Sequence, residues 1–443
     1  MKICVIPIDN RPVCYNLIED IANIDKSIEL YLPDRNLLGD LTKNADTEKI
    51  LEWLKNLPKI DKIVISLDTI AYGGLIPSRR SSLTFEQIKE RIENLKEILI
   101  SKNAEIHAFS SIMRISNNNI NQEEKEYWKD YGTKIFNYSF DIHKNGHAET
   151  DIPREILEDY INTRKRNFEI NKLYLKWQKE GIFKTLIFSK DDCAEFGLNV
   201  KEAQELEKLG GFTKTGADEI PLSLFARAIE KKVKIAPIFI ENEQKHLISN
   251  YEDIPIEKSV LSQIELGGME ITSEEDADIV LVVNNFKNNQ GEIVMKKSTE
   301  PFNKELILPQ KSYAIADVRF ANGADNKFVK EFLKNDIKDD TFYGYSAWNT
   351  SANTLGSLLC ALKVKFNAEK YNKKAFTKLQ LIRFLDDWAY QANVRQQIQN
   401  PYINNEMSNF ENKLKSVLNT DFKTKYSFPW NRLFEIEVDI EFN

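Results

Sequence analysis

The sequence predicts an α/β protein with a (β/α)-barrel-like domain of parallel strands, followed by a mainly helical C-terminal segment. Three observations support this class. Short apolar runs alternate with amphipathic stretches over the first 350 residues. The runs are rich in Ile, Val and Phe and lack strict apolar–polar alternation, which is typical of strands buried on both faces. After residue 350 the pattern becomes mainly helical. Strands that alternate with helices indicate βα units and a parallel sheet.

The apolar runs give the expected strands. They lie at residues 3–8, 28–32, 62–67, 105–110, 185–189, 234–240, 278–283 and 313–318, and a further strand is expected at 342–348. Eight strands before residue 320 favour a TIM barrel. A doubly wound sheet, or two smaller α/β halves, is the alternative, because the sequence does not settle whether the sheet closes.

Helical patterns fill the intervals between the runs. The stretch 85–102 places apolar residues at three- and four-residue steps, which is the spacing of one helix face. A long insertion near 120–180 is dense in Lys, Glu, Tyr and Asn. We therefore expect a catalytic domain over 1–350 that carries this insertion, and a helical region over 351–443 that packs on it.

Composition narrows the class of partner. The formal net charge of −7 is spread along the 443 residues, which argues against nucleic acid or an anionic membrane as the main partner. No stretch approaches the roughly 18 apolar residues that a membrane span needs, and the start lacks a signal-peptide pattern. The four cysteines lack metal-type and Cys-x-x-Cys spacing. We expect a cytoplasmic protein without a cofactor, and the oligomeric state stays open.

Polar side chains follow nearly every expected strand. In both architectures the active site lies beyond the carboxyl ends of the strands, so we expect one shared polar pocket there. The side chains expected to bind substrate are Asp9, Arg11, Asp68, Tyr72, Arg79, Arg114, Asn284, Asn285, Asp317, Trp348 and Asn349. Arg79 and Arg114 either clamp a carboxylate or phosphate of the substrate or form structural ion pairs with nearby Asp residues.

Two pairs of adjacent acids are the candidate catalytic groups. Asp191 and Asp192 follow the strand at 185–189, where mutual repulsion and burial would both raise the cost of ionisation. Such a pair suits a site that needs one acid protonated and the other charged, although a solvated acidic loop is the alternative. Asp218 and Glu219 form the second pair, just before a predicted helix. Capping of that helix is the alternative there.

Other motifs give weaker signals. "GGL" at 73–75 lacks the spacing of a dinucleotide fingerprint or a P-loop, which favours a tight turn that uses the positive φ of glycine. His143 and His147 have the spacing of a helical zinc pair, but Asn145 and Gly146 lie between them. We therefore expect no metal, with Mg²⁺ or Ca²⁺ held by Asp and Asn oxygens as the alternative.

A set of motifs carries a resemblance across nearly the whole chain. "PIDNRPVCY", "LLGD", "SLDTIAYGGLIPSR", "SSIMR", "DDCAEFGLN", "GADE", "ADVRFANGAD" and "GYSAWNTSANTLG" resemble, in order, a bacterial family catalogued only as a domain of unknown function. Asn10 stands where an acid is common in that family, and Phe196 where Tyr is common. The resemblance implies kinship and no particular activity.

A local similarity points to chemistry. "SKDD" and "GADE" are similar to the acidic segments of barrel hexosaminidases that use the acetamido group of the substrate. This similarity implies that one carboxylic acid protonates the leaving oxygen while its charged neighbour orients the acetamido group. We expect a glycoside hydrolase of carbohydrate metabolism that acts on a small-molecule or oligosaccharide substrate, N-acetylated amino sugars included. The alternatives are an Asp-based metal-dependent hydrolase or lyase on a phosphorylated or carboxylated small molecule, and a non-catalytic sugar-binding sensor.

Overall fold

The computed structural model describes residues 1–191, 194–397 and 404–443. The chain forms two compact units, and each is described here by itself. The first unit comprises residues 1–15, 29–221 and 251–253, and the second comprises 16–28, 222–250 and 254–443. The expected domain boundary at residue 350 falls inside the second unit.

The first unit is built on a six-stranded sheet in the order β2-β1-β3-β4-β5-β6, and every pairing in it is parallel. Its strands are β1 (Lys2–Ile6), β2 (Glu29–Tyr31), β3 (Lys62–Ser66), β4 (Glu105–Ile112), β5 (Thr185–Lys190) and β6 (Thr213–Thr215). The apolar runs in β1, β3, β4 and β5 are buried almost throughout. Burial on both faces explains why these runs show no strict alternation.

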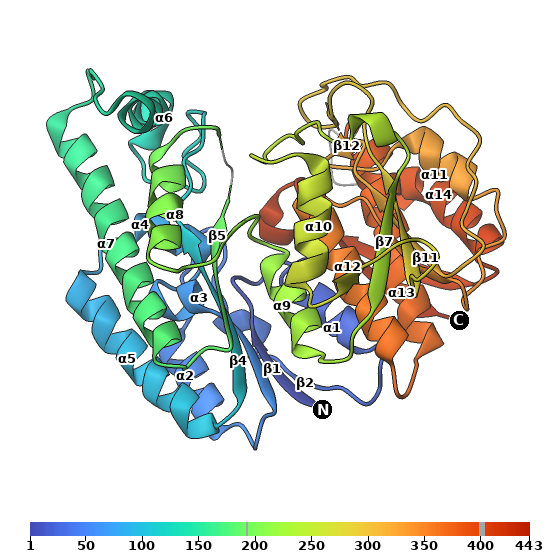
Figure 1. The fold of residues 1–443 in the computed structure, drawn as a ribbon, viewed down its shortest axis with the longest axis horizontal. Coiled ribbons are helices and arrows are strands. Elements are labelled where there is room, and N and C mark those ends of the chain that lie inside the picture. The colour runs from blue at the N-terminus through green and yellow to red at the C-terminus, as the bar shows by residue number, and fades with distance from the viewer. Residues whose placement is uncertain (192–193, 398–403) are drawn as a thin grey trace. The chain divides into compact units, whose positions relative to one another are not determined.

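Helices α2, α3, α5 and α7 cover one face of this sheet and enclose the core of the unit (Figure 1). The helices here are α2 (Thr47–Asn56), α3 (Leu67–Ala71), α4 (Leu75–Arg80), α5 (Phe85–Lys102), α6 (Trp128–Asn145), α7 (Arg154–Lys179) and α8 (Leu198–Lys208), with the 3₁₀ turn η1 (Arg35–Leu37). Thr84 and Gln87 form a capping box that starts α5, and Asn103 in the left-handed region ends it. The insertion near 120–180 contains α6 and α7.

The second unit is built on a five-stranded sheet in the order β13-β11-β9-β7-β8, again with every pairing parallel. Its strands are β7 (Lys234–Phe239), β8 (Glu270–Ile271), β9 (Ile279–Asn284), β11 (Tyr313–Asp317) and β13 (Phe342–Ser346). When the sheet is read from β8 and its strands are numbered in chain order, their spatial order is 2-1-3-4-5. The first five strands of the other sheet have the same order. Both halves therefore have the flavodoxin-like doubly wound order.

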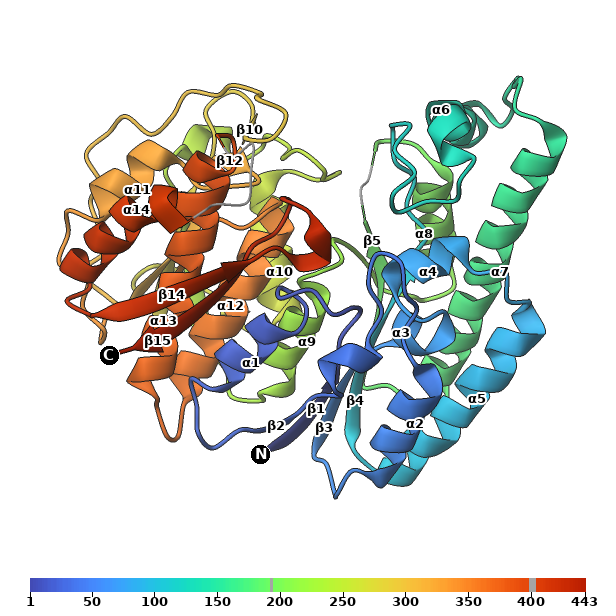
Figure 2. The same cartoon turned by 180° about the vertical axis from the view of Figure 1, so that it is seen from behind.

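Helices α10 and α12 pack on one face of the second sheet, and their leucines and isoleucines meet the apolar strands. The helices are α1 (Asn16–Ala22), α9 (Ile220–Ala228), α10 (Ile256–Leu266), α11 (Asn326–Phe332), α12 (Ser351–Asn367), α13 (Lys373–Arg383), the π-helix η3 (Phe384–Val394) and α14 (Asn404–Val417), with 3₁₀ turns η2 (Asn242–Gln244) and η4 (Pro429–Asn431). Short strands β10 (Gly291–Glu292) and β12 (Phe320–Ala321) pair in parallel, while β14 (Phe422–Ser427) and β15 (Glu437–Phe442) pair antiparallel beside α13 (Figure 2).

The expected class is confirmed: parallel α/β with a helical C-terminal region. The expectation of a barrel is corrected by the topology, because the apolar parallel strands of the two described units lie in two open sheets, and the short pairs β10–β12 and β14–β15 are separate from them. Strand β3 pairs with β1 rather than with β2, so the sheet grows in two directions from β1 and retains two edges. The alternative of two α/β halves describes the protein. None of the described helices is long and apolar enough to cross a membrane.

Candidate functional site

The carboxyl ends of β1 and β3 mark the place in the first unit where a ligand is expected. In open parallel sheets, ligands bind outside the carboxyl ends of the strands, at the point where the strand order reverses. That point lies between β1 and β3, which are neighbours in the sheet. Asp9 and Arg11 follow β1, and Asp68 lies in the helix that begins directly after β3. Three of the residues predicted from sequence therefore lie at this switch point.

Arg11 joins two acids at this end of the sheet. Its Nε lies 2.9 Å from Asp9 Oδ2, and its Nη2 donates to the same oxygen at 2.7 Å. Nη1 and Nη2 also donate to the two carboxylate oxygens of Asp218, at 3.0 and 2.5 Å. All three side chains are buried. The bidentate geometry is the strongest form of charge-assisted hydrogen bonding, and it holds the β1 loop to the loop that follows β6.

The pKa of Asp218 is shifted from its usual value. Burial raises its pKa, Arg11 opposes that rise, and the charges of Asp9 and Asp191 add to it. Since Arg11 is shared between two carboxylates, it offsets only part of the burial effect. The electrostatic effect of Asp191 on Asp218 connects the ends of β5 and β6. Asp218 thus has the character required of a proton donor.

A second charged cluster surrounds Asp191. Its Oδ2 lies 3.5 Å from Arg79 Nη2 and 3.4 Å from Arg114 Nη1. Glu124 accepts from both arginines, at 3.2 Å from Arg79 and 3.1 Å from Arg114. Glu123 accepts from Arg114 Nη2 at 2.8 Å. The two arginines therefore form ion pairs, which is the structural alternative considered for them.

Asp191 is one of the more accessible members of this cluster, with Glu123. Its side chain is 22% exposed, whereas that of Arg79 is 1% exposed. The contacts of 3.4 and 3.5 Å from Asp191 to the arginines are longer than the usual range for a charge-assisted hydrogen bond. A ligand oxygen could therefore compete for the same guanidinium groups. Its predicted partner, Asp192, lies outside the described residues.

Asp68 is completely buried at the switch point. Its Oδ2 accepts a 2.7 Å hydrogen bond from the backbone N–H of Ser111, at the end of β4. Its Oδ1 is buried and has no hydrogen-bond partner among the described residues. Burial raises the pKa of Asp68 to about 7, against the hydrogen bonds from Ser111 and Ser110. This carboxyl group is more completely buried than those of Asp9, Asp191 and Asp218.

Glu219 is also completely buried. One carboxylate oxygen, Oε2, accepts from the N–H of Ala217 at 3.2 Å. The carboxylate occupies the space beside Gly216, where an added Cβ would lie only 1.7 Å from Oε1. Gly216 has φ +114°, a conformation that glycine adopts readily. The glycine in "GADE" therefore allows both the turn and the position of Glu219.

The turn predicted at "GGL" is confirmed. Gly73 and Gly74 have φ of +95° and +132°, and Gly74 N–H closes the turn on Asp68 O at 3.1 Å. Tyr72 precedes this turn and is buried, with the Arg166 guanidinium 5.6 Å from its ring centre. Burial strongly raises the pKa of the Tyr72 hydroxyl. Tyr72 contributes to the interior of the first unit.

The predicted residues of the second unit belong to a buried network of their own. Asn284 Nδ2 donates to Asp317 Oδ1 at 2.7 Å, and Asn284 Oδ1 accepts from Arg319 Nε at 3.0 Å. Arg319 Nη2 reaches Glu241 at 2.9 Å, and Tyr345 OH donates to Asp317 at 3.2 Å. Burial and the charge of Asp325 raise the pKa of Asp317 to about 7. These polar atoms are largely satisfied within the unit.

The remaining predicted residues lie around this network. Asn285 exchanges two hydrogen bonds with the backbone of Glu241, across the switch point between β7 and β9. Trp348 is buried. Asn349 adopts φ +58°, and its carbonyl accepts from Asn322 N–H at 2.8 Å. Asn284 and Asp317 were expected in one cavity with residues of the first unit, and that expectation stays a prediction.

Sequence analysis did not single out three charged residues that form ion pairs near the carboxyl ends of the strands. Glu123 and Glu124 lie in the "NQEEKE" stretch after β4, and Arg319 lies in "ADVRF" after β11. The adjacent acids in "NQEEKE" were a usable signal, like the other two acid pairs. For Arg319 the signal was its place two residues after a strand end that was already singled out. Among the described residues, no group of three or more His, Cys, Asp or Glu side chains is placed to hold a metal ion.

A family model described as "Protein of unknown function (DUF4127)" matches residues 3–439. The chain belongs to this family. No entry among curated proteins matches it. The motifs in the sequence resembled a family of unknown function over nearly the whole chain. The family model covers the same extent, residues 3–439.

Several of the motifs that resembled a family of unknown function lie at strand ends of this DUF4127 protein. "SLDTIAYGGL" covers the end of β3 and the turn after α3, "GADE" follows β6, and "ADVRF" spans the end of β11. Chemically, the first unit of this DUF4127 protein combines a buried acid of raised pKa, Asp218, with a more accessible acid, Asp191, and three arginines around them. Such a set can donate a proton and bind an oxygen-rich substrate.

Proposed function

We propose that this protein is a glycoside hydrolase whose active site lies at the carboxyl end of the first sheet. The observation that carries the proposal is the relation between Asp218 and Asp191. Asp218 is buried, its pKa is raised, and the charge of Asp191 contributes to that rise. Two carboxyl groups in unlike environments are the usual requirement for glycosidic bond cleavage, in which one acts as acid and the other remains charged.

In this proposal Asp218 protonates the leaving glycosidic oxygen. Arg11 holds the Asp218 carboxyl group in place through two hydrogen bonds. Asp191, next to Arg79 and Arg114, is the charged partner and faces the developing positive charge of the sugar. Asp192, adjacent in sequence, is the candidate that would orient an acetamido group. Substrate-assisted cleavage of N-acetylated amino sugars is part of the proposal.

Substrate binding is assigned to the long contacts around Asp191. Arg79 and Arg114 lie 3.5 and 3.4 Å from it, so a sugar hydroxyl or carboxylate could gain hydrogen bonds from them at small cost. We place the protein in the cytoplasm, acting on a small-molecule or oligosaccharide substrate. Among the described cysteines, the buried thiols of Cys4, Cys14 and Cys360 form no disulfide, which agrees with a reducing compartment.

A panel of chromogenic glycosides, N-acetylhexosaminides included, tests the proposal with three variants. Asp218→Asn should lower kcat on the best substrate by about 10²–10⁴-fold, because the general acid is lost. Asp191→Asn should also lose activity. Asp61→Asn is the matched control, since Asp61 is exposed and accepts from the N–H of Lys2 at the amino ends of β1 and β3, the opposite end of the strands from the proposed site. Full activity of Asp218→Asn would refute the assignment of the acid.

The arginines favour a second candidate function. Arg11, Arg79 and Arg114 place three guanidinium groups at one end of the sheet, which suits a phosphorylated or carboxylated substrate. A hydrolase or lyase of such a small molecule would release phosphate or cleave the substrate only with a divalent metal added. Turnover of sugar phosphates with Mg²⁺ and none of glycosides would favour it. Saturable sugar binding without turnover would instead indicate a sensor.

A further inference from the structure

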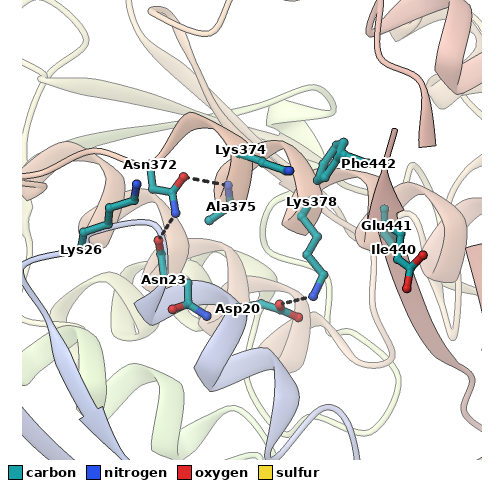
Figure 3. A pocket seen from close by; sticks show the side chains of 10 residues that line it. All are labelled: Asp20, Asn23, Lys26, Asn372, Lys374, Ala375, Lys378, Ile440, Glu441 and Phe442. Atoms are coloured by element: carbon teal, nitrogen blue, oxygen red, sulfur yellow. Dashed lines mark hydrogen bonds and ion pairs between the residues drawn. The ribbon is translucent and has the colours of Figure 1, made fainter. Parts of the chain in front are cut away.

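The second unit contains a cavity of its own, of about 630 Å³. Its walls come from three parts of the chain, which are the end of α1 with the loop after it, the first turns of α13, and the end of β15 (Figure 3). This volume is typical of sites for small organic ligands. Of the residues proposed for glycoside cleavage, those that the structure describes do not line it.

Three lysines give this cavity a positive character. Lys26, Lys374 and Lys378 line it, against the carboxylates of Asp20 and Glu441. Lys378 is neutralised in part, because its Nζ lies 3.2 Å from Asp20 Oδ1.

The other two lysines keep their charge available. The Lys374 ammonium lies 5.1 Å from the centre of the Phe442 ring. Within the part of the chain that the structure describes, neither Lys26 nor Lys374 forms an ion pair with a carboxylate. These two ammonium groups are therefore free to bind an anion.

The walls of the cavity are tied together by hydrogen bonds. The Asp25 carboxylate, which is buried, accepts from the N–H groups of Glu369 and Lys370 at 3.1 and 3.0 Å. Asn372 N–H donates to Ile24 O at 2.8 Å. Main-chain bonds thus join the loop after α1 to the segment that starts α13. A site that is already formed loses less entropy when a ligand binds.

The asparagine at the start of α13 also has a structural role here. Asn372 Oδ1 accepts from Ala375 N–H at 3.4 Å as the cap of α13, while its Nδ2 donates to Asn23 O at 3.1 Å (Figure 3). Since its amide is engaged on both sides, Asn372 fixes the start of α13, and Lys374 lies in the first turn of that helix. The positive end of the α13 dipole adds to the attraction for an anion.

We propose that this cavity binds a phosphorylated small molecule, with its phosphate held by Lys26 and Lys374 and its organic part against the Phe442 ring. Lysine ammonium groups bind phosphate as compact point charges. Ala375, Ile440 and Phe442 supply the apolar surface that an organic group requires. The site lies wholly in the second unit, so the proposal is independent of the activity assigned to the first.

Calorimetric titration of the full chain with inorganic pyrophosphate tests this site. We expect saturable binding that weakens as salt is raised. Lys26→Ala and Lys374→Ala should each weaken binding about tenfold, because each removes one charged hydrogen bond to the phosphate. Both side chains are exposed, so the variants should fold normally, and equal melting temperatures check this. Lys232→Ala, which removes an exposed lysine of the same unit outside the cavity, is the control and should bind like the parent.

Three results would overturn the proposal. The first is the absence of pyrophosphate binding at millimolar concentration. The second is unchanged affinity in the Lys26→Ala, Lys374→Ala double variant, which would place the anion elsewhere. The third is citrate binding as tightly as pyrophosphate, which would indicate a general anion site rather than one for phosphate. None of these readouts depends on glycosidase activity, so each distinguishes failure here from failure of the proposed function.

Discussion

Arg11 and Asp218 are 207 residues apart in the chain, yet the Arg11 guanidinium donates to both oxygens of the Asp218 carboxylate. The same guanidinium also binds Asp9. One buried cation therefore serves two buried acids, and the ends of β1 and β6 are held together by it. The balance between burial, which raises the pKa of Asp218, and Arg11, which lowers it, sets the proton affinity of the candidate acid.

Removal of this cation should destabilise the first unit strongly. Arg11→Met leaves Asp9 and Asp218 buried without their partner, and we expect a loss of about 3–5 kcal/mol in the free energy of unfolding. Urea denaturation measures it. Arg154→Met is the control, because Arg154 is exposed and, within the described part of the chain, pairs only with Glu158 on its own helix, which is worth about 0.5 kcal/mol or less. A loss below about 1 kcal/mol for Arg11→Met would contradict the shared-cation interpretation.

The buried carboxyl of Asp68 should make stability depend on pH. Its pKa rises from 3.8 in the unfolded chain to about 7 in the folded protein, so the folded state binds more protons between these values. Stability should therefore fall as the pH rises from about 4 to 7, by at most about 1.4 kcal/mol per pH unit for this group. Above pH 7 its contribution should level off.

Asp68→Asn tests this dependence. Asparagine keeps an oxygen to accept the N–H of Ser111 but does not titrate, so the variant should lose that part of the pH slope and gain stability over the parent at pH 8. Melting temperatures between pH 4 and 8 measure both effects. Asp317 and Asp387 also have pKa values near 7, so a residual slope should remain in the variant. Identical slopes for parent and variant would show that Asp68 does not carry the effect.

Gly216→Ala should disturb Glu219 directly. The new methyl group would overlap the Glu219 carboxylate, and the backbone at φ +114° disfavours any side chain. We expect a loss of about 2 kcal/mol or more, read from chemical denaturation. Gly210→Ala is the matched control, since Gly210 has φ +90° and an added Cβ there would have no described residue within 4 Å. Equal losses in the two variants would mean that strain alone matters and that the Glu219 contact is weak.

Tyr345→Phe should weaken the buried network of the second unit. The change removes a hydrogen bond to Asp317, one of the acids with a raised pKa, and should cost about 1–2 kcal/mol of stability. Glycosidase activity, proposed for the first unit, should persist. Tyr371→Phe provides the comparison, because Tyr371 is exposed and bonds to Asp339 at the surface; we expect a smaller loss there. A larger loss of stability for Tyr371→Phe than for Tyr345→Phe would contradict the stabilising role assigned to the hydrogen bond between Tyr345 and Asp317.

The strands were predictable because their signal is local. Runs such as "KIVIS" in β3 and "IVLVVN" in β9 are buried on both faces, and burial of this kind selects Ile and Val over a few consecutive residues. For the same reason, the sequence correctly indicated that Asp9, Asp68 and Asp191 follow the ends of strands. A strand end can be recognised from the residues next to it.

Which strands are neighbours was decided only by the tertiary structure. A buried parallel strand has the same composition in a closed barrel and in an open sheet, so nothing within "ICVI" reveals that β1 lies between β2 and β3. The shared strand order of the two sheets was equally hidden, because it appears only when pairings are known. For this reason the sequence did not settle whether the sheet closes, and the barrel that it favoured is not the architecture found.

For the charged residues, the sequence likewise predicted the residue types, and the tertiary structure decided which residues pair. The sequence by itself determined the residue types at the strand ends, and with them the candidate acids. Only the folded chain decided that Arg11 serves Asp218 and that Glu124 lies between Arg79 and Arg114. Charge pairing depends on distance in space and on burial, and both are set by the packing of segments far apart in the chain.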